Sequence, residues 1–384
     1  MSRVGWTAIL TVVAGLLAVP VFAGAADPAA LTDRPLAGPS SVRDVREYWT
    51  RERMREAAPL DLGRQNGARG AGKPRATSSD AIERPETTAY PNRVVGKIFA
   101  SWPGVGDITC TGSVINTETD SFVLTASHCL FENGVFFTNV TFVPGYRQGA
   151  RPFGEFPGVQ LAVPRLVVLG SQLPNDHGSI LVAPSASGQS VEDSVGSFGI
   201  SLFGSPRQRW RAYGYPADPP FDGERLLTCD SPTTIFDATI DPAGIGIDCE
   251  MTAGASGGPW VIAETTLVAS NSSYAIPDEL PGVLFGPQFA ESAAALFDSA
   301  HPVRCGRKLA FIVGTEESDR LVGTSGPDVI LGDRGNDTII GKGGRDRLCG
   351  EDGRDKLKGG GGKDLCDGGP SRDRTGRCEK EKKV

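Results

Sequence analysis

The chain has 384 residues, which is too long for one small domain and predicts two or three units. Its 50 glycines and 28 prolines, with few aromatic residues, are typical of a turn-rich, β-rich protein. The formal net charge of −7 argues against nucleic acid as the main partner, because that partner requires an excess of basic residues.

Residues 1–26 have the pattern of a secretory signal peptide. Arg3 supplies a positive charge, residues 8–22 are mostly apolar, and residues 23–25 form a small-residue cleavage site. A transmembrane anchor is the alternative, but the apolar run is short for a span of about 20 residues. We therefore expect a secreted, extracellular protein that does not insert into a membrane once the signal is removed.

Residues 27–92 differ in composition from the chain that follows. Val45 and Trp49 lie at helical spacing and predict a helix over 41–58. Residues 62–89 are rich in Gly, Arg, Ser, Thr and Pro, and we expect them to be flexible. A helix followed by such a linker suggests a pro-segment, and a spacer that inhibits nothing is the alternative.

From Arg93 onward, short apolar runs alternate with turn residues. The runs cover residues 94–100, 122–126, 135–143, 166–169, 179–183 and 267–269. Several short strands at such intervals predict a sandwich or a barrel. Residues 288–300 then have the apolar spacing of a helix.

Residues 314–367 form six consecutive nine-residue units, each of which begins with glycine. The sixth position of the units is occupied by Asp319, Asp328, Asp337, Asp346, Asp355 and Asp364. The eighth position is Leu, Ile or Cys, so it can pack inward from a short strand while the Gly-rich half turns. The turn carbonyls and the aspartates can surround a hard cation.

This pattern resembles the calcium-binding nonapeptide repeats of RTX-type β-rolls. The resemblance implies a short parallel β-roll over residues 303–384, with structural calcium at the six aspartates. Basic residues dilute the acidity of the units, so a β-roll without calcium is the alternative. These residues are Arg345, Arg347, Arg354, Lys356, Lys358 and Lys363.

Two earlier motifs contain the candidate chemistry. Residues 252–260 read Thr-Ala-Gly-Ala-Ser-Gly-Gly-Pro-Trp, which places Ser256 among small residues where a bulky substrate can reach its hydroxyl. His128 ends the apolar run 123–128 and supplies a candidate base. Serine is a weak nucleophile until a base takes its proton, so the two motifs together indicate nucleophilic catalysis.

These motifs resemble the trypsin-like, chymotrypsin-fold serine peptidases, especially the secreted bacterial branch that includes glutamyl endopeptidases. The resemblance covers residues 93–302 and extends to Cys110-Thr-Gly-Ser-Val-Ile115 and Tyr213-Gly-Tyr-Pro-Ala217. It implies an all-β fold of two β-barrels, at about 93–190 and 191–287, with the active site between them. The implied substrates are proteins or peptides, cleaved through an acyl-enzyme.

The resemblance also implies the roles of single residues. His128 would be the general base, Ser256 the nucleophile, and the N–H groups of Gly254 and Ser256 the oxyanion hole. The third triad member must lie between them in the chain, and Asp176 stands in a matching segment before a short apolar strand. Three rival aspartates stand in poorer contexts: Asp120, Asp193 and Asp218.

Glu250 and Ser272 are the candidate residues of the substrate pocket. Glu250 stands six residues before Ser256, where trypsin-like members carry the acid that favours Arg or Lys substrates. A half-exposed structural glutamate beside Cys249 is the alternative. Glutamyl endopeptidases have a histidine in the pocket wall, whereas residues 268–274 contain none, which argues against a glutamate preference.

Eight cysteines in an exported chain predict a disulfide framework, and no two have the Cys-x-x-Cys spacing of zinc ligands. Cys110 and Cys129 match the family's histidine-loop disulfide, and Cys229 and Cys249 would brace the segment before the serine. The last four allow three pairings, among them Cys305 with Cys349 and Cys366 with Cys378.

The sequence thus predicts a secreted serine endopeptidase with a pro-segment and a β-roll. The alternative is a non-catalytic binding protein, in which the peptidase fold is inert and the repeats are the functional module. A missing triad residue would indicate that alternative, and the sequence provides all three.

Overall fold

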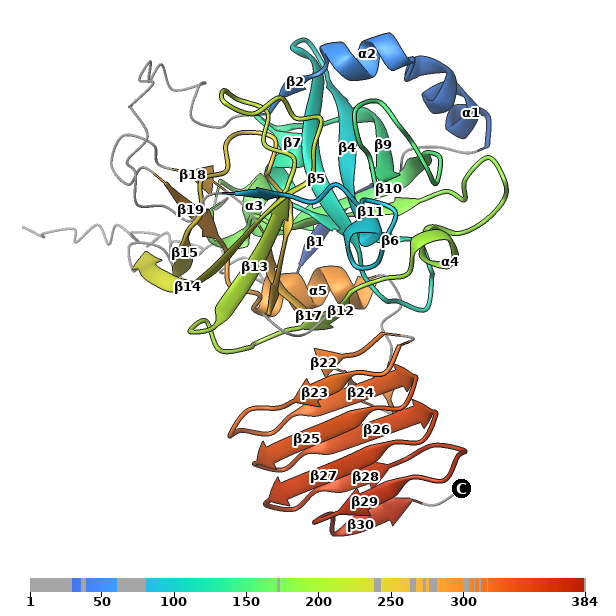
Figure 1. Ribbon diagram of the computed structural model, residues 1–384, viewed down its shortest axis with the longest axis vertical. Helices are drawn as coiled ribbons and strands as arrows, with labels where there is room; N and C mark the ends of the chain where they lie inside the picture. Colours follow the sequence, from blue (N-terminus) through green and yellow to red (C-terminus); the bar gives the residue numbers. More distant parts are fainter. Residues whose placement is uncertain are drawn as a thin grey trace, which may run out of the picture.

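The structure is a computed structural model of the chain, shown in Figure 1. It describes residues 30–35, 39–60, 81–170, 173–237, 243–262, 267–271, 274–275, 282–299, 304–306, 308–310, 312–315 and 317–382. The expected signal peptide lies outside the described residues. No helix within these ranges is long and apolar enough to cross a membrane.

Six strands form a closed barrel in the first half of the chain. They are β4 (Val95–Trp102), β5 (Gly106–Val114), β6 (Phe122–Thr125), β9 (Thr138–Pro144), β10 (Phe156–Pro164) and β11 (Gly178–Val182). Their order is β10-β11-β6-β5-β4-β9, and β9 pairs again with β10. Ile98, Phe142 and Ile180 are fully buried inside.

A second sheet follows, with the order β18-β19-β15-β14-β13-β16-β17-β12. Its strands are β12 (Gly199–Ser201), β13 (Arg209–Gly214), β14 (Leu227–Asp237), β15 (Gly244–Asp248), β16 (Pro259–Ile262), β17 (Leu267–Asn271), β18 (Tyr274–Ala275) and β19 (Val283–Gly286). Trp210, Ile247 and Trp260 belong to its separate core. A barrel and a second sheet confirm the all-β, chymotrypsin-like architecture that the sequence predicted.

Short elements connect the strands. They are η2 (Asn92–Val94), η3 (Ser127–Cys129), β7 (Phe131–Glu132), β8 (Val135–Phe136), α3 (Arg165–Val168), η4 (Leu173–Asn175), α4 (Val191–Val195) and α5 (Glu291–Ser299). The helix expected at 288–300 is α5, and its Phe297 packs edge-on against Phe122 of the barrel. The strand expected at 166–169 is wrong, because those residues lie largely in the short helix α3.

The N-terminal segment lies mainly against the first barrel, and its last strand pairs with the second sheet. Its elements are β1 (Leu31–Pro35), α1 (Pro39–Tyr48), α2 (Arg51–Glu56), β2 (Ala58–Pro59) and β3 (Ile82–Glu83). Strand β1 pairs with β10, β2 with β5, and β3 with β14. The single helix expected at 41–58 is two helices, because Thr50 caps α2 by accepting a hydrogen bond from the Arg53 N–H at 3.2 Å.

Two contacts fix this segment to the barrel. Trp49 is 1% exposed, and its indole N–H donates to the carbonyl of Asn139. Asp107, at the start of β5, accepts hydrogen bonds from the Tyr48 hydroxyl at 2.7 Å and from Arg53 at 2.8 Å. The segment therefore contributes side chains to the core of the first barrel.

The C-terminal repeats form a parallel β-roll of two sheets. One contains β22 (Ile312–Val313), β24 (Val329–Arg334), β26 (Arg347–Asp352), β28 (Leu365–Asp367) and β30 (Lys380–Lys382). The other contains β23 (Arg320–Val322), β25 (Thr338–Gly343), β27 (Lys356–Gly361) and β29 (Arg374–Gly376). The eighth residue of each unit faces inward, as Leu348 and Leu357 illustrate. The expected parallel β-roll is confirmed.

The β-roll continues the second sheet. Strand β12 pairs with β22, so one row of strands runs from the second sheet into the roll (Figure 1). The side-chain amide of Asn116 donates to Asp333 at 2.6 Å and to the Gly314 carbonyl at 3.1 Å. A small hairpin of β20 (Arg304–Cys305) and β21 (Lys308–Leu309) lies at the junction.

Candidate functional site

His128 and Asp176 meet at the end of two paired strands. Strand β6 leads into η3 and β11 follows Asp176, and the register pairs Thr125 with Gly178. The Nδ1 atom of His128 lies 2.7 Å from Oδ2 of Asp176, and the His128 backbone N–H donates to Oδ1 at 3.0 Å. Both side chains are 0% exposed. The carboxylate therefore fixes the orientation of the imidazole.

Two further residues hold Asp176, and the sequence analysis missed both. The hydroxyl of Ser127 donates to Oδ1 of Asp176 at 2.7 Å, and the Asn271 amide donates to the Asp176 carbonyl at 3.0 Å. In the sequence, a role for Ser127 was indicated only by its position directly before the candidate base His128. Asn271 gave no signal, because it is distant in the chain and lies in an ordinary apolar run.

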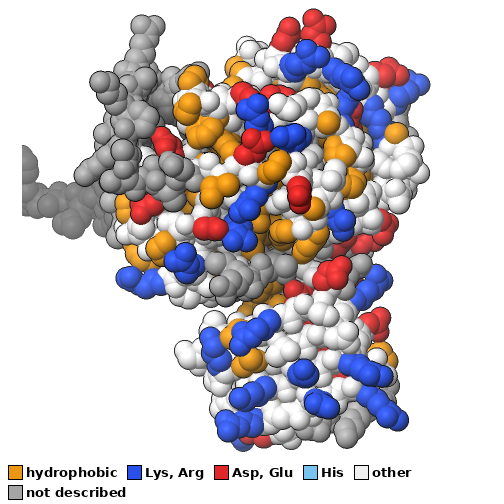
Figure 2. Space-filling model, viewed as in Figure 1, with side chains coloured by type: hydrophobic (Ala, Val, Ile, Leu, Met, Phe, Trp, Pro, Cys, Tyr) orange, Lys and Arg blue, Asp and Glu red, His pale blue; other side chains and the backbone are white. Residues whose placement is uncertain are grey.

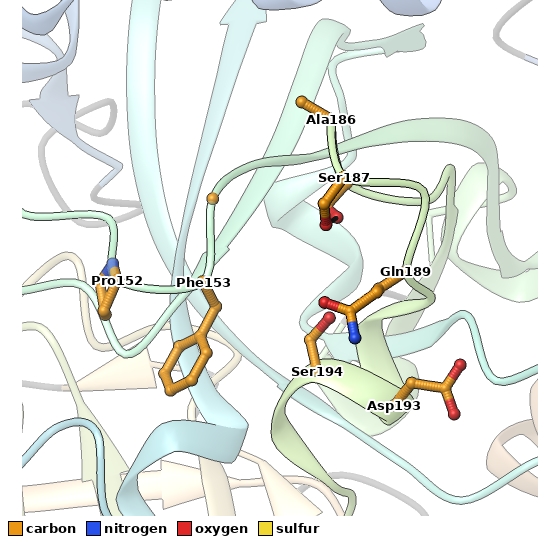
Figure 3. A pocket seen from close by; sticks show the side chains of 9 residues that line it. Pro152, Phe153, Ala186, Ser187, Gln189, Asp193 and Ser194 are labelled. Carbon is orange, nitrogen blue, oxygen red and sulfur yellow. Dashed lines mark hydrogen bonds between the residues drawn. The ribbon is translucent and has the colours of Figure 1, made fainter.

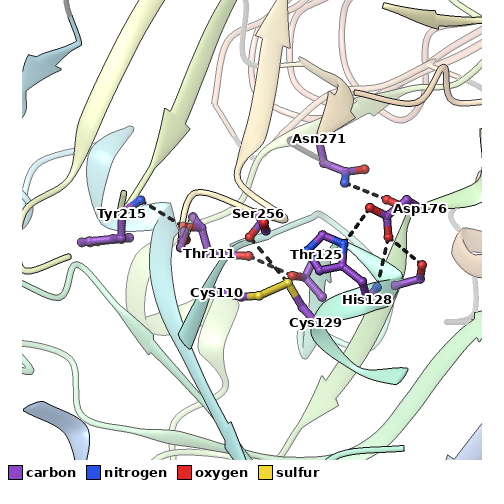
Figure 4. The surroundings of a disulfide bond; sticks show 11 residues. Cys110, Thr111, Thr125, His128, Cys129, Asp176, Tyr215, Ser256 and Asn271 are labelled. Carbon is purple, nitrogen blue, oxygen red and sulfur yellow. Dashed lines mark hydrogen bonds and ion pairs between the residues drawn. A yellow bond between two sulfur atoms is a disulfide. The ribbon is translucent and has the colours of Figure 1, made fainter. Parts of the chain in front are cut away.

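The loop that contains Ser256 packs against the strands that lead to His128. The Thr111 N–H donates to the Ser256 carbonyl at 2.8 Å. Gly257 has φ +80°, and a Cβ there would lie 2.1 Å from Oγ1 of Thr125, so only glycine fits. In the view of Figure 4 the His128 imidazole lies between Ser256 and Asp176. The three predicted triad residues are thus gathered in one region.

The backbone before Ser256 is held in a defined conformation. Gly254 has φ +95°, and its carbonyl accepts a hydrogen bond from the Thr111 hydroxyl at 2.8 Å. The Ala253 carbonyl accepts from the Ala217 N–H at 2.7 Å. Within the described ranges, no acceptor is recorded for the N–H groups of Gly254 and Ser256. Both N–H groups can therefore donate to a ligand.

Four disulfides are present: Cys110–Cys129, Cys229–Cys249, Cys305–Cys349 and Cys366–Cys378. The first two are the pairs that the resemblance implied, and the last two are one of the three pairings that the sequence left open. Ligand atoms of Cys110, Cys129 and His128 lie within 4.8 Å of one another. Both sulfurs are bonded in the disulfide, so this group offers no thiolate to a metal.

The other residues that the sequence suggested for the triad or the substrate pocket either lie apart from the His128–Asp176 pair or fall outside the described residues. Asp193 is part of α4 and lines a surface hollow of about 390 Å³, whose lining includes no proposed triad residue (Figure 3). Glu250 is half-buried directly after Cys249. Ser272 lies outside the described residues, so its pocket role stays a prediction.

His177 follows Asp176 and is fully buried against α5. Its Nε2 lies 2.8 Å from the Ser292 hydroxyl, and its ring contacts Phe289 edge-on at 5.8 Å between centroids. Burial lowers the pKa of His177 to about 4, so the ring is neutral at physiological pH. Its environment is structural, as the sequence analysis expected.

The repeat aspartates form a buried ladder in the β-roll. The backbone N–H of each of the first five aspartates donates to the carboxylate one coil further along, as Asp328 does to Oδ1 of Asp346 at 3.0 Å. The second carboxylate oxygen, Oδ2, is buried and has no hydrogen-bond partner among the described residues in Asp337, Asp346, Asp355 and Asp364. A buried, unpartnered carboxylate oxygen is costly unless a cation or proton meets it. These four residues therefore fit calcium.

The first two units differ from the later ones. The Thr315 N–H donates to Oδ2 of Asp319 at 2.7 Å, and the Thr324 N–H donates to Oδ2 of Asp328 at 2.7 Å. Later units place other residues at this second position, and Lys342 there has φ +78°. The threonines already satisfy Asp319 and Asp328, so these two fit a cation less well than the other four.

The ladder extends one unit beyond the six that the sequence analysis identified. Residues 368–376 begin with glycine and carry Asp373 at the sixth position. The Asp355 N–H donates to Oδ1 of Asp373 at 3.0 Å, and strand β29 follows. Asp373 was missed because Thr375 replaces the apolar eighth residue, although the Gly and Asp spacing was visible.

Comparisons with known proteins agree with the fold of the two sheets and with the repeats. The model of the RTX calcium-binding nonapeptide repeat matches residues 313–348 and 341–374. The crystal structure of protease Anisep from Arthrobacter nicotinovorans matches at 30% identity and TM-score 0.53, covering 57% of this chain and 99% of that one. A thermostable serine protease, AL20, from an extremophilic microorganism matches at 32% identity and TM-score 0.51, covering 54% and 97%. No curated protein matches the chain.

The chain therefore belongs to the chymotrypsin-fold serine proteases and carries RTX-type nonapeptide repeats at its C-terminal end.

Proposed function

We propose that this protein is a secreted serine endopeptidase that uses Ser256, His128 and Asp176 as a catalytic triad. The observation that supports this most directly is the fully buried His128–Asp176 pair at 2.7 Å, beside the loop of Ser256. Homology to serine proteases supports a peptidase as the class of enzyme. The substrates are proteins or peptides.

In the proposed mechanism, Nε2 of His128 takes the proton of the Ser256 hydroxyl as its oxygen attacks the scissile carbonyl. The developing oxyanion accepts hydrogen bonds from the N–H groups of Gly254 and Ser256. Protonated His128 then gives its proton to the leaving amine. In the second half, His128 takes a proton from water as that water attacks the acyl-enzyme, and returns it to the Ser256 oxygen as the acid product leaves. Asp176 holds the imidazole in one tautomer and stabilises its protonated form.

A fluorophosphonate probe tests this mechanism, because it labels only an activated serine. Wild-type protein should be labelled once, at Ser256, while Ser256→Ala and His128→Ala should not react. Ser187→Ala is the matched control, since Ser187 is exposed on a turn. No labelling of folded wild type would instead favour the non-catalytic binding protein.

We propose that the segments outside the peptidase part act in export and maturation. Residues 1–26 are a cleaved signal, residues 27–92 a pro-segment, and residues 93–302 the peptidase unit. The four disulfides are consistent with an extracellular protein. Mass spectrometry of the secreted protein would identify the mature N-terminus, and a start before residue 60 would contradict removal of the pro-segment.

A second proposed function is calcium binding by the β-roll of residues 303–384. The buried Oδ2 atoms of Asp337, Asp346, Asp355 and Asp364 support it. Calcium would supply positive charge to these carboxylates, and the chain would supply oxygen ligands from aspartates and turn carbonyls. Its role would be structural, with no part in peptide hydrolysis.

A further inference from the structure

One face of the β-roll carries a group of basic side chains that the proposed peptidase does not use. Strands β23, β25, β27 and β29 form this sheet. In β27, Leu357 is buried in the core while Lys356 and Lys358 on either side are exposed. Alternation along a strand therefore places both lysines on the outer face of the sheet.

Three arginines stand close to these lysines. Lys356 pairs in register with Arg374 of β29, and Arg354 and Arg372 precede Lys356 and Arg374 by two residues. All three arginines are exposed. We name the five residues Arg354, Lys356, Lys358, Arg372 and Arg374 the basic face. Lys and Arg side chains cover much of the roll in the view of Figure 2.

Close ion pairs do not neutralise the basic face within the described part of the chain. Among the described residues, none of its five members makes an ion pair within 4.0 Å. Of the nearest ladder aspartates, Asp355 and Asp364 are at most 2% exposed, and the half-buried Asp373, between Arg372 and Arg374, accepts the Asp355 N–H at 3.0 Å. Adjacent strands are about 4.8 Å apart, so Lys356 and Arg374 repel each other directly. An anionic partner would relieve this repulsion.

The chemistry of the face restricts the partner. Arginine presents a planar fork of donors that matches the oxygens of a phosphate group. Residues 314–384 contain no Phe, Tyr, Trp or His, so the face offers no ring on which a nucleobase could stack. Cations on two adjacent coils, as at Lys356 and Arg374, fit a linear chain of regularly spaced anions.

We propose that the basic face binds a linear polyol-phosphate polymer, a phosphodiester chain without bases such as those of cell surfaces. The binding would hold the secreted enzyme at a surface while the Ser256 site remains free. It requires neither the catalytic triad nor the oxyanion hole.

The test measures binding of the full chain to purified poly(glycerol phosphate) of about 25 units by titration calorimetry, in a buffer containing calcium. Binding should weaken steeply between low and physiological salt, because salt screens such contacts. The triple variant Lys356→Gln, Lys358→Gln, Arg374→Gln should lose affinity about tenfold or more. Its cleavage of a small peptide and its melting temperature should match those of wild type.

Matched controls make each outcome decisive. The triple variant Arg165→Gln, Arg207→Gln, Arg209→Gln removes the same charge from exposed positions of residues 93–302 and should keep wild-type affinity. An equal loss in both triples would mean that only net charge matters, and would overturn the proposal. Tighter binding to an oligothymidylate of equal phosphate number, or to anionic vesicles alone, would also overturn it. If the roll triple does not fold, Arg374→Gln alone should still weaken binding.

Discussion

The hydroxyl of Ser127 donates a hydrogen bond to Oδ1 of Asp176 at 2.7 Å, inside a region where both side chains are 0% exposed. The same oxygen accepts the His128 backbone N–H at 3.0 Å. Oδ2 is thereby directed at the imidazole. Ser127 acts through Asp176, and so it is a positioning residue for the proposed triad.

Ser127→Ala should lower kcat/KM by about tenfold or more without unfolding the protein. A hydrogen bond to a charged group contributes about 1.5–3 kcal/mol, and its loss leaves Asp176 less fixed. Ser127→Thr retains the hydroxyl and should recover part of the activity. Steady-state kinetics on a peptide substrate measure both. Equal activity of Ser127→Ala and wild type would remove Ser127 from the site.

Asp176→Asn should preserve the fold and reduce kcat by about 10⁴, the known effect of the equivalent change in chymotrypsin-type enzymes. The amide would favour the wrong tautomer of His128, whose Nδ1 now contacts the carboxylate at 2.7 Å. Asp193→Asn on α4 is the control and should remain active. The reverse result would identify Asp193 as the triad member.

The candidate triad could be predicted because its signals are local. Ser256 and His128 stand in short motifs whose small residues are needed where backbones approach closely, as at Gly257 beside Thr125. The hydrogen bonds from Ser127 and Asn271 to Asp176 span 49 and 95 residues of chain. Only the folded arrangement of strands reveals such contacts.

The fold could be predicted from the sequence to about the same extent as the candidate triad. The nine-residue period predicts the β-roll, because glycine and aspartate recur at positions that every coil needs. The apolar run at 166–169 was misread as a strand, since four apolar residues suit a strand or a short helix equally. The pairing of β12 with β22 joins two separately predicted units, and neither strand's sequence indicates its partner.

Glu250→Gln tests the pocket that the sequence analysis proposed. If Glu250 contacts the substrate side chain, cleavage after Arg or Lys should fall by about 2–5 kcal/mol in kcat/KM, because one partner of a desolvated ion pair is lost. A peptide-library cleavage profile provides the measurement. An unchanged profile would leave Glu250 as a structural neighbour of Cys249.

Trp49→Ala should destabilise the first barrel without altering the chemistry of Ser256. Trp49 is 1% exposed, contacts Phe99 and donates to the Asn139 carbonyl. Loss of a buried tryptophan costs about 3–5 kcal/mol. Thermal unfolding of the precursor should show a lower melting temperature, and Trp49→Phe should lose less. No shift in Trp49→Ala would contradict the role of this segment in the core.

The ladder aspartates should make the stability of the β-roll depend on both pH and calcium. Burial raises the pKa of Asp337 to about 7 and that of Asp346 to about 6, above the value of about 3.9 in an unfolded chain. Between pH about 4 and about 7 the folded state therefore holds more protons than the unfolded state. Without calcium, the free energy of unfolding should fall as pH rises through this window.

Calcium binds the ionised carboxylates, so its stabilising effect should grow over the same window. Calorimetry of the full chain with calcium or a chelator, at pH 5 and pH 8, should show the larger thermal shift at pH 8. Asp346→Asn should reduce that shift. Asp319→Asn should retain it, because Thr315 already donates to the Asp319 carboxylate at 2.7 Å. Equal shifts at both pH values, or none, would leave a β-roll held by its core and its disulfides alone.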